Sequence, residues 1–247
     1  MNTNDSSGSQ VALITGAGKG IGLEVARQLA ARGMTAILTA RTLEKSQAAA
    51  QRIAGAGLDI RPRALDVTDQ ASVEQLAAEI EREFGRLDIL VNNAAAFVNW
   101  SETALTADLE AASAVLATNL FGAWRMCQAF MPLMRRSAHG RIVIVSSGAG
   151  SHGEQQFGLT TGGGSVASYG ISKAALNALT AKLAAELEGS GILINAVCPG
   201  FTATAPGMEA MGARPIPAGA ASVLWAATLP DDGPSGGFFR DGKPLPW

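Results

Sequence analysis

The sequence predicts an α/β fold with a single doubly wound parallel sheet of about seven strands and helices on both faces. Short apolar runs alternate with longer helical segments along almost the whole chain, the order that crossover helices between parallel strands produce. Several of these runs are almost continuously apolar, as expected for strands covered on both faces. The chain has 247 residues, of which 47% are hydrophobic, enough for a sizeable core.

Each predicted strand is a short run of apolar and β-branched residues bounded by turn residues. The last strand follows the final helix, and residues 241–247, which include two prolines, are predicted to be extended. The predicted strands are 11–15, 35–39, 59–65, 87–91, 141–146, 192–197 and 237–240.

The predicted helices fill the segments between the strands. In the fifth helix, four leucines from Leu176 to Leu187 recur at intervals of three and four and form an apolar stripe. Asp69 is suited to capping the third helix, and Gly85 stands where that helix should end. The predicted helices are 20–32, 43–55, 69–84, 107–136, 166–188 and 218–229.

The chain is predicted to consist of a flexible tail, residues 1–9, and one domain, residues 10–247, because no repeat or linker interrupts the alternation. The tail has no signal-like region and no apolar run reaches about eighteen residues, which predicts a cytoplasmic protein without a membrane span. A formal net charge of −2 argues against a nucleic-acid partner. Cys127 and Cys198 are predicted to be buried thiols, and the scattered cysteines and histidines predict no metal site.

A glycine-rich segment directly after the first strand is suited to holding a pyrophosphate. Glycines allow a tight turn there, and the backbone amides at the start of the following helix can approach an anion closely. The alternative is an ordinary strand-to-helix turn, but this strand–loop–helix order is that of Rossmann-type dinucleotide-binding folds. The residues predicted to contact the pyrophosphate are Gly16, Gly18, Lys19, Gly20, Ile21 and Gly22.

The end of the second strand favours NADP(H) over NAD(H). Folds that prefer NAD place an acidic residue there for the ribose 2′-hydroxyl, whereas this chain has Arg41 and no acid before Glu44. Arg41 and Lys19 suit a 2′-phosphate, although both are also compatible with simple solvation. Asp66 and Val67, at the end of the third strand, stand where an adenine edge would lie, and Asp66 is equally suited to capping a turn.

The only tyrosine, Tyr169, precedes Lys173 by four residues, so that both share one helix face. A nearby ammonium group lowers the pKa of a phenol, which predicts a proton donor and acceptor for carbonyl reduction or alcohol oxidation. By itself this spacing is more often a surface coincidence, and the glycine loop is what favours the catalytic interpretation.

Together these motifs resemble the short-chain dehydrogenase/reductase family, and the resemblance runs from about residue 11 to the end of the chain. The glycine loop, Arg41 and the final residues look most similar to NADPH-dependent carbonyl reductases. Further matches are the run 92–95 after the fourth strand, Asn119, the pair Ser146 and Ser147, and Pro199–Gly200.

The resemblance implies a role for each matched residue. Tyr169 would be the general acid, Lys173 would lower its pKa and bind the nicotinamide ribose, Ser147 would polarise the carbonyl, and Asn119 would hold a water beside Lys173. Further cofactor contacts are implied for Asn93, Ala94, Pro199, Gly200 and Thr204.

Two departures from the family pattern stand out. Ala95 replaces a usual glycine, and the interval from Ser147 to Tyr169 is 169 − 147 = 22 residues. This is longer than is common in the family and shorter than the insertion of its monomeric carbonyl reductases. Since many members pair through the helices equivalent to 107–136 and 166–188, a homodimer or homotetramer is expected.

The loops after the strands are predicted to select the substrate. Their apolar and methionine-rich residues suit a bulky, apolar ketone or aldehyde, although they equally suit loop cores or a subunit interface. The function expected is reversible, NADPH-dependent carbonyl reduction; the alternatives are a 3-oxoacyl-thioester reductase and a non-catalytic NADP-sensing or scaffold protein. The candidate substrate residues are Phe97, Gln155, Gln156, Phe157, Phe201 and Met208.

Overall fold

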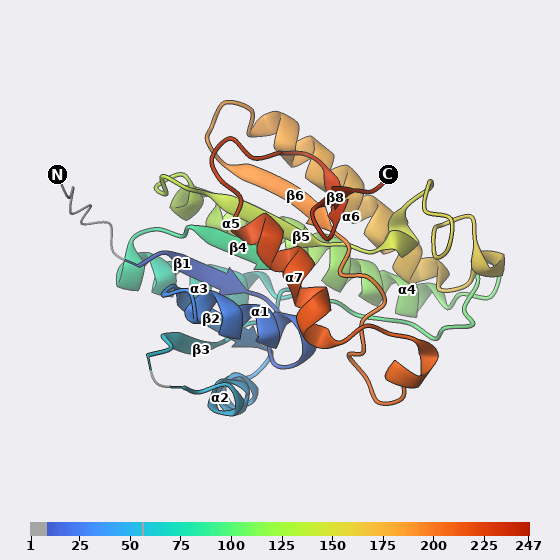
Figure 1. Ribbon diagram of the computed structural model, residues 1–247, viewed down its shortest axis with the longest axis horizontal. Helices are drawn as coiled ribbons and strands as arrows, with labels where there is room; N and C mark the ends of the chain where they lie inside the picture. The colour runs from blue at the N-terminus through green and yellow to red at the C-terminus, as the bar shows by residue number, and fades with distance from the viewer. Residues whose placement is uncertain (1–8, 56) are drawn as a thin grey trace.

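One eight-stranded sheet runs through the molecule (Figure 1). The computed structural model describes residues 9–55 and 57–247, so the predicted tail lies outside the described residues except for Ser9. All neighbouring strands are parallel except the last pair. In spatial order the strands are β3 (Ile60–Ala64), β2 (Thr35–Ala40), β1 (Val11–Ile14), β4 (Ile89–Asn92), β5 (Arg141–Val145), β6 (Leu193–Val197), β7 (Phe238–Arg240) and β8 (Lys243–Pro244).

The order reverses between β1 and β4, because the chain first adds strands on one side of β1 and then crosses to the other. This is the topological switch point of a doubly wound sheet, where ligands bind outside the carboxyl ends of the strands. The predicted fold class is therefore confirmed, with one strand more than the seven predicted. The additional strand, β8, lies in the segment predicted to be merely extended.

The helices cover both faces of the sheet. Their bounds are α1 (Gly20–Ala30), α2 (Leu43–Arg52), α3 (Gln70–Phe84), α4 (Leu109–Leu116), α5 (Ala123–Met134), α6 (Ala167–Glu186) and α7 (Ile216–Ala227). Short helical turns are η2 (Gly148–Gly150), η3 (Gly162–Gly164) and η4 (Glu209–Met211).

Alternate residues of each central strand serve opposite cores. In β1, Leu13 packs with α3, α5 and α6 on one face, whereas Ile14 packs with α1 and α7 on the other. Both side chains have no exposed surface. Continuous apolar strands are thus required here, because neither face of the central sheet meets water.

The helix predicted over 107–136 is not a single α-helix. The six residues of η1 (Ala117–Gly122) form a π-helical segment between α4 and α5, and Asp108 caps the start of α4 by accepting a hydrogen bond from the Glu110 amide. A Cβ atom on Gly122 would lie 2.7 Å from a methyl group of Val67, so the glycine permits close approach to the loop after β3. The π segment contains Asn119, and π segments often occur at functional sites.

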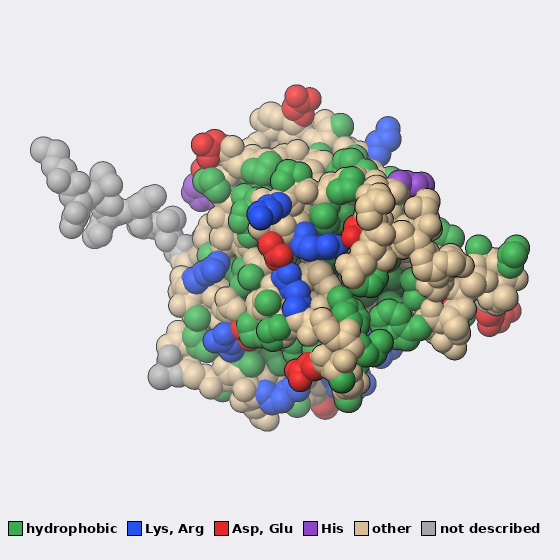
Figure 2. Space-filling model, turned by 45° about the vertical axis from the view of Figure 1, so that its right-hand side comes forward, with side chains coloured by type: hydrophobic (Ala, Val, Ile, Leu, Met, Phe, Trp, Pro, Cys, Tyr) green, Lys and Arg blue, Asp and Glu red, His purple; other side chains and the backbone are tan. Residues whose placement is uncertain are grey.

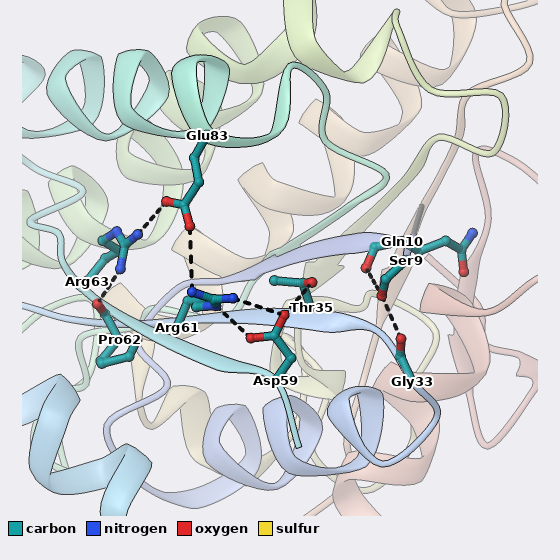
Figure 3. Close-up of polar contacts among 9 residues, drawn as sticks. All are labelled: Ser9, Gln10, Gly33, Thr35, Asp59, Arg61, Pro62, Arg63 and Glu83. Atoms are coloured by element: carbon teal, nitrogen blue, oxygen red, sulfur yellow. Dashed lines mark hydrogen bonds and ion pairs between the residues drawn. The ribbon is translucent and has the colours of Figure 1, made fainter. Parts of the chain in front are cut away.

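The outer edge of the sheet, at β3, carries charged side chains (Figure 3). Arg61 forms an ion pair with Asp59 at 2.6 Å, and Arg63 pairs with Glu83 of α3 at 2.5 Å. Ser9 is the first described residue, and its hydroxyl donates to the Gly33 carbonyl at 2.5 Å. These contacts attach the first described residue and the edge strand to the rest of the fold.

Candidate active site

The loops that follow β1, β4, β5 and β6 leave the sheet at the carboxyl ends of these strands, and those after β4, β5 and β6 project on the right of Figure 1. This edge includes the switch point between β1 and β4, so it is the place where the fold predicts a ligand site. Viewed from this side, hydrophobic side chains gather in a hollow between the projecting loops (Figure 2).

The glycine loop has the close packing predicted for a pyrophosphate site. Gly16 has a φ of 62°, and a Cβ atom on it would lie 2.8 Å from the Cα of Ala94. The Asn93 side-chain amide donates to the carbonyls of Thr15 and Gly16 at 2.9 and 3.1 Å, which fixes the glycine loop to the segment after β4. α1 begins at Gly20, so its unpaired amides point to the space beside the loop.

The loop after β6 reaches the same place. A Cβ atom on Gly20 would contact a Thr204 methyl group at 3.4 Å, so the segment after Pro199–Gly200 borders the phosphate loop. Ile21 and Gly22 pack inward from the first turn of α1, and Gly22 lies against the Asn93 side chain. These contacts bring most of the predicted cofactor residues to one surface.

The residues expected near a 2′-phosphate are exposed and cationic. Lys19 precedes α1, and Arg41 follows β2. Sequence reasoning missed Arg52, whose guanidinium group, at the end of α2, donates to the carbonyl of Gly18. In the sequence, Arg52 looks like any other surface arginine. Its distance along the chain from the glycine loop does not show that the end of α2 lies next to Gly18.

Asp66 acts as a turn cap, one of its two expected roles. Its carboxylate accepts bonds from the Thr68 amide and hydroxyl at 2.9 and 2.7 Å. These bonds, together with the charges of Arg41 and Arg125, lower the pKa of Asp66 against the opposing effect of burial. Val67 is buried against Gly122, so its side chain supports the site from within the core.

Tyr169 lies in the first turn of α6 and is hydrogen-bonded to Ser147 at the end of β5. Burial raises the pKa of Tyr169 to about 12, the Ser147 bond acts in the opposite direction, and Cys198 raises it further. Ser146 instead donates to Asn177 at 2.6 Å within the core. Of the two serines, Ser147 is therefore the one that contacts the phenol.

The expectation that Lys173 lowers the pKa of Tyr169 is wrong in this structure. The Lys173 ammonium group lies 5.4 Å from the centre of the tyrosine ring and donates to the Val145 carbonyl at 2.8 Å. Lys173 is only 2% exposed, and this burial lowers its pKa to about 8, with Cys198 opposing the change. Loss of solvent around the phenol therefore outweighs the attraction of an ammonium group directed elsewhere.

Asn119 connects the π segment to α6. Its amide group donates to Ser172 at 2.9 Å and to the Ala96 carbonyl at 3.1 Å, and its carbonyl accepts from the Ala96 amide at 2.7 Å. Both amide protons are therefore used within the protein. Ser172 was not predicted, although it stands between Tyr169 and Lys173 in the sequence.

Cys198 is a second residue whose place sequence reasoning missed. Its sulfur accepts bonds from the amides of Gly148 and Gly200, at 3.2 and 3.4 Å, and from the Arg240 guanidinium group at 3.3 Å. The first amide follows Ser147 and the second follows Pro199. This buried thiol thus joins two loops of the site, whereas the sequence indicated only a core residue.

Aromatic rings surround the approach to Tyr169. Phe97 lies 4.6 Å from the Tyr169 ring and 4.9 Å from Trp100, measured between ring centres. Phe201 continues the series, at 6.2 Å from Trp100 and 6.3 Å from Phe157. Phe97 and Trp100 in the loop after β4 and Phe157 in the loop after β5 are exposed, and together with Phe201 after β6 they present an apolar surface beside the phenol.

The remaining candidate substrate residues are not part of these ring contacts. Gln155 is exposed and donates to the Gly153 carbonyl within its own loop, and the backbone amide of Gln156 donates to Glu154. The sulfur of Met208 accepts a long bond from the Thr204 hydroxyl at 3.9 Å, which places Met208 beside the cofactor residues.

Comparison with known proteins decides the family. The model of the short chain dehydrogenase family matches residues 10–213. The chain belongs to this family. In a short-chain dehydrogenase, the fold and the order of motifs described above are those expected, and the chain is an oxidoreductase by family.

Several relatives are similar over most of their length. The 3-oxoacyl-(acyl-carrier-protein) reductase FabG of Escherichia coli is 36% identical over 195 residues, covering 79% of this chain and 74% of the relative. Carbonyl reductase (NADPH) 1 of Sus scrofa is 32% identical over 282 residues, covering 98% and 96%. The structure of NADPH-bound carbonyl reductase from chicken fatty liver aligns with a TM-score of 0.84 at 27% identity, covering 97% of this chain and 99% of that one.

Within the described residues, no helix is long and apolar enough to cross a membrane. The same part of the chain has no group of three or more His, Cys, Asp or Glu side chains placed to hold a metal ion.

The buried Lys173 should make the stability of this short-chain dehydrogenase depend on pH. Its pKa falls from 10.5 to about 8 on folding, so between these values the unfolded chain binds more protons than the folded one. The free energy of unfolding should therefore rise with pH in this window, by about 2 kcal/mol from this residue. Urea unfolding at about pH 7.5 and 9.5 should show a smaller rise for Lys173→Met; equal rises in both proteins would contradict the assignment.

Proposed function

We propose that this short-chain dehydrogenase is an NADP(H)-dependent reductase of bulky, apolar ketones and aldehydes. The observation that carries the proposal is the half-buried Tyr169 phenol, bonded to Ser147 and flanked by Lys173 and by exposed aromatic rings. NADPH, when bound, supplies the hydride for the carbonyl carbon. The residues of the chain supply the proton, the position of the carbonyl and the exclusion of water.

The glycine loop fits the pyrophosphate of this cofactor, because side chains on Gly16 or Gly22 would collide with Ala94 or Asn93. Lys19 and Arg41 would hold the 2′-phosphate. The relatives named above as NADPH carbonyl reductases support the same cofactor.

Tyr169 would donate its proton to the carbonyl oxygen as the hydride arrives, while Ser147 polarises that oxygen. A pKa near 12 keeps the phenol protonated at neutral pH, so that it has a proton to donate. Because both amide protons of Asn119 are used, a water beside Lys173 would have to donate to an oxygen of Asn119. Lys173 would turn from Val145 toward the ribose of the bound cofactor.

A 3-oxoacyl-thioester reductase remains the second candidate, since one such enzyme is 36% identical. It requires a basic surface for an acidic carrier, for which the sequence offers Arg125, Arg135 and Arg136. Arg125 donates to the Val67 carbonyl at 2.6 Å and to Gln70, and Arg136 pairs with Glu81 at 2.8 Å. Because Arg125 and Arg136 are used in contacts within the chain, they are less suited to binding an acidic carrier. The exposed aromatic loops instead suit a free carbonyl compound.

The test is the loss of NADPH absorbance with a panel of aromatic ketones, aldehydes, quinones and short 3-oxoacyl thioesters, repeated with NADH. Turnover of the aromatic carbonyl compounds with NADPH supports the proposal. Preference for the thioesters favours the second candidate. Tight NADPH binding without turnover of any compound would favour a cofactor-sensing protein.

We also propose that two or more copies associate through α4, α5 and α6. Leu109 is 77% exposed, and Phe121, Trp124 and Ile171 are exposed large apolar residues on the same group of helices. Burying them in a partner removes apolar surface from water. Light scattering at micromolar concentration should give at least twice the chain mass of 25.2 kDa, and Ile171→Asp should lower it; a mass of one chain for the unchanged protein would contradict the proposal.

A further inference from the structure

The end of the chain lies against the loop that follows Ser147. After β8, Leu245 donates its amide to the Phe238 carbonyl at 2.8 Å and packs with buried Phe238. The ring of Trp247 stacks on Phe238, with ring centres 5.6 Å apart. Residues 245–247, here called the strap, are therefore attached to the end of the sheet.

The strap binds the loop through three hydrogen bonds. The Trp247 carbonyl accepts from the amides of His152 and Gly153 at 3.0 and 3.1 Å. The Ser151 hydroxyl donates to the Pro246 carbonyl at 2.7 Å. The contact is also tight, since a Cβ atom on Gly153 would lie 2.6 Å from the Cβ of Pro246.

Ser151 connects the strap to the rest of the loop. It has no exposed surface, and its hydroxyl also accepts from the amides of Gly153 and Glu154 at 3.2 and 3.0 Å. Its carbonyl accepts from the Leu159 amide at 2.8 Å, which closes residues 151–159 into a compact loop. The Glu154 carboxylate in turn accepts a hydrogen bond from the Phe157 amide.

Phe157 is the loop's contribution to the aromatic surface beside Tyr169, because its ring faces Phe201 at 6.3 Å. The strap does not touch these rings itself. Its contacts instead determine where the backbone of Phe157 lies relative to the loop that carries Phe201. The site thus depends on residues about ninety positions later in the chain.

We propose that the strap is a positioning element for the substrate site. Through Ser151 and Glu154 it holds Phe157 opposite Phe201 and so sets the width of the aromatic surface. Gly153, Ser151 and Pro246 are positioning residues in this arrangement and contact neither cofactor nor substrate. The kinetic consequence rests on the proposed carbonyl reduction, whereas the structural consequence does not.

Gly153→Ala tests the proposal, because the added methyl group must separate the strap from the loop. Gly153 does not have a positive φ, so alanine is compatible with its backbone. Gly55→Ala is the matched control: its Cβ would meet only the Leu58 side chain, at 3.4 and 3.7 Å. A second pair, Trp247→Ala and Trp247→Phe, removes or keeps the ring that stacks on Phe238.

Hydrogen exchange of the full chain is the first measurement. Amides of residues 152–159 should exchange at least about tenfold faster in Gly153→Ala and Trp247→Ala, and at unchanged rates in Gly55→Ala and Trp247→Phe. Unchanged exchange in the loop would overturn the proposal. So would equal acceleration throughout the sheet, since the strap would then only stabilise the fold.

Steady-state kinetics is the second measurement. For a bulky aromatic ketone, Gly153→Ala should raise KM about fivefold and leave kcat within about twofold, because the reacting groups are untouched. Its NADPH affinity should equal that of Gly55→Ala. Altered kcat with unchanged KM would contradict a positioning role. If the protein turned over no carbonyl compound but showed the exchange pattern, the proposed function would be refuted. The role of the strap in positioning the loop would still be supported.

Discussion

Tyr169→Phe should lower the rate of carbonyl reduction about 10²–10⁴-fold while leaving NADPH affinity nearly unchanged. The substitution removes one hydroxyl group and keeps the ring that contacts Phe97. Only the proton donor and the bond to Ser147 are lost, so the packing of the site is conserved. Single-turnover reduction followed at 340 nm, together with NADPH titration of the same protein, measures both quantities.

The matched control is Phe97→Leu, which keeps the phenol and removes the neighbouring ring. Its effect should fall mainly on KM, because in the proposed function the ring would contact the substrate and donates no proton. If Tyr169→Phe retained most of the rate, proton donation by Tyr169 would be excluded. A loss of NADPH binding in Tyr169→Phe would show that the substitution acts on the cofactor site instead.

Arg41→Ala should weaken NADPH binding about 10–100-fold and leave NADH binding unchanged. A hydrogen bond to a charged group contributes about 1.5–3 kcal/mol, and a 2′-phosphate is the only feature that distinguishes the two cofactors. Arg41 is exposed at the end of β2, so its removal should not disturb the fold. Titration with 2′,5′-ADP and with 5′-ADP measures the effect without turnover.

Arg82→Ala is the control for charge, since this exposed arginine lies in the last turn of α3. It makes the same change in net charge away from the glycine loop and should leave both affinities unchanged. Equal weakening of NADPH and NADH by Arg41→Ala would mean that the residue supports the loop generally. If Arg41→Ala weakened the binding of neither cofactor, Lys19 or Arg52 would be assigned as the residue that binds the 2′-phosphate.

The sheet was predictable because its central strands are short, almost continuously apolar runs bounded by turn residues, which is typical of strands covered on both faces. The division of the helix over 107–136 was not, because π segments are rare and the residues on both sides of η1 remain in the right-handed helical conformation. β8 was not predicted, because a strand of two residues, one of them a proline, leaves no sequence pattern. Local sequence patterns thus predicted the elements whose structure depends mainly on their own residues.

In the site, motif order indicated Tyr169, Ser147 and Lys173, which the structure brings together. The sign of the Tyr169 pKa change could not be predicted, because it depends on burial by loops distant in sequence, among them the one with Phe97. The role of Cys198 was hidden for a similar reason. Two of its three donors, Gly148 and Arg240, lie about forty to fifty residues away in the sequence, so only the folded chain reveals them.

Both margins of the sheet resist extension by an additional strand. At β3 the exposed margin contains Pro62, which has no amide proton to donate, and is flanked by Arg61 and Arg63 with their acidic partners. At the opposite margin β8 is only two residues long and includes Pro244. Such features protect proteins against open-ended joining of sheets and the fibrils that follow. Partially unfolded forms that lose either margin should therefore be the aggregation-prone species of this protein.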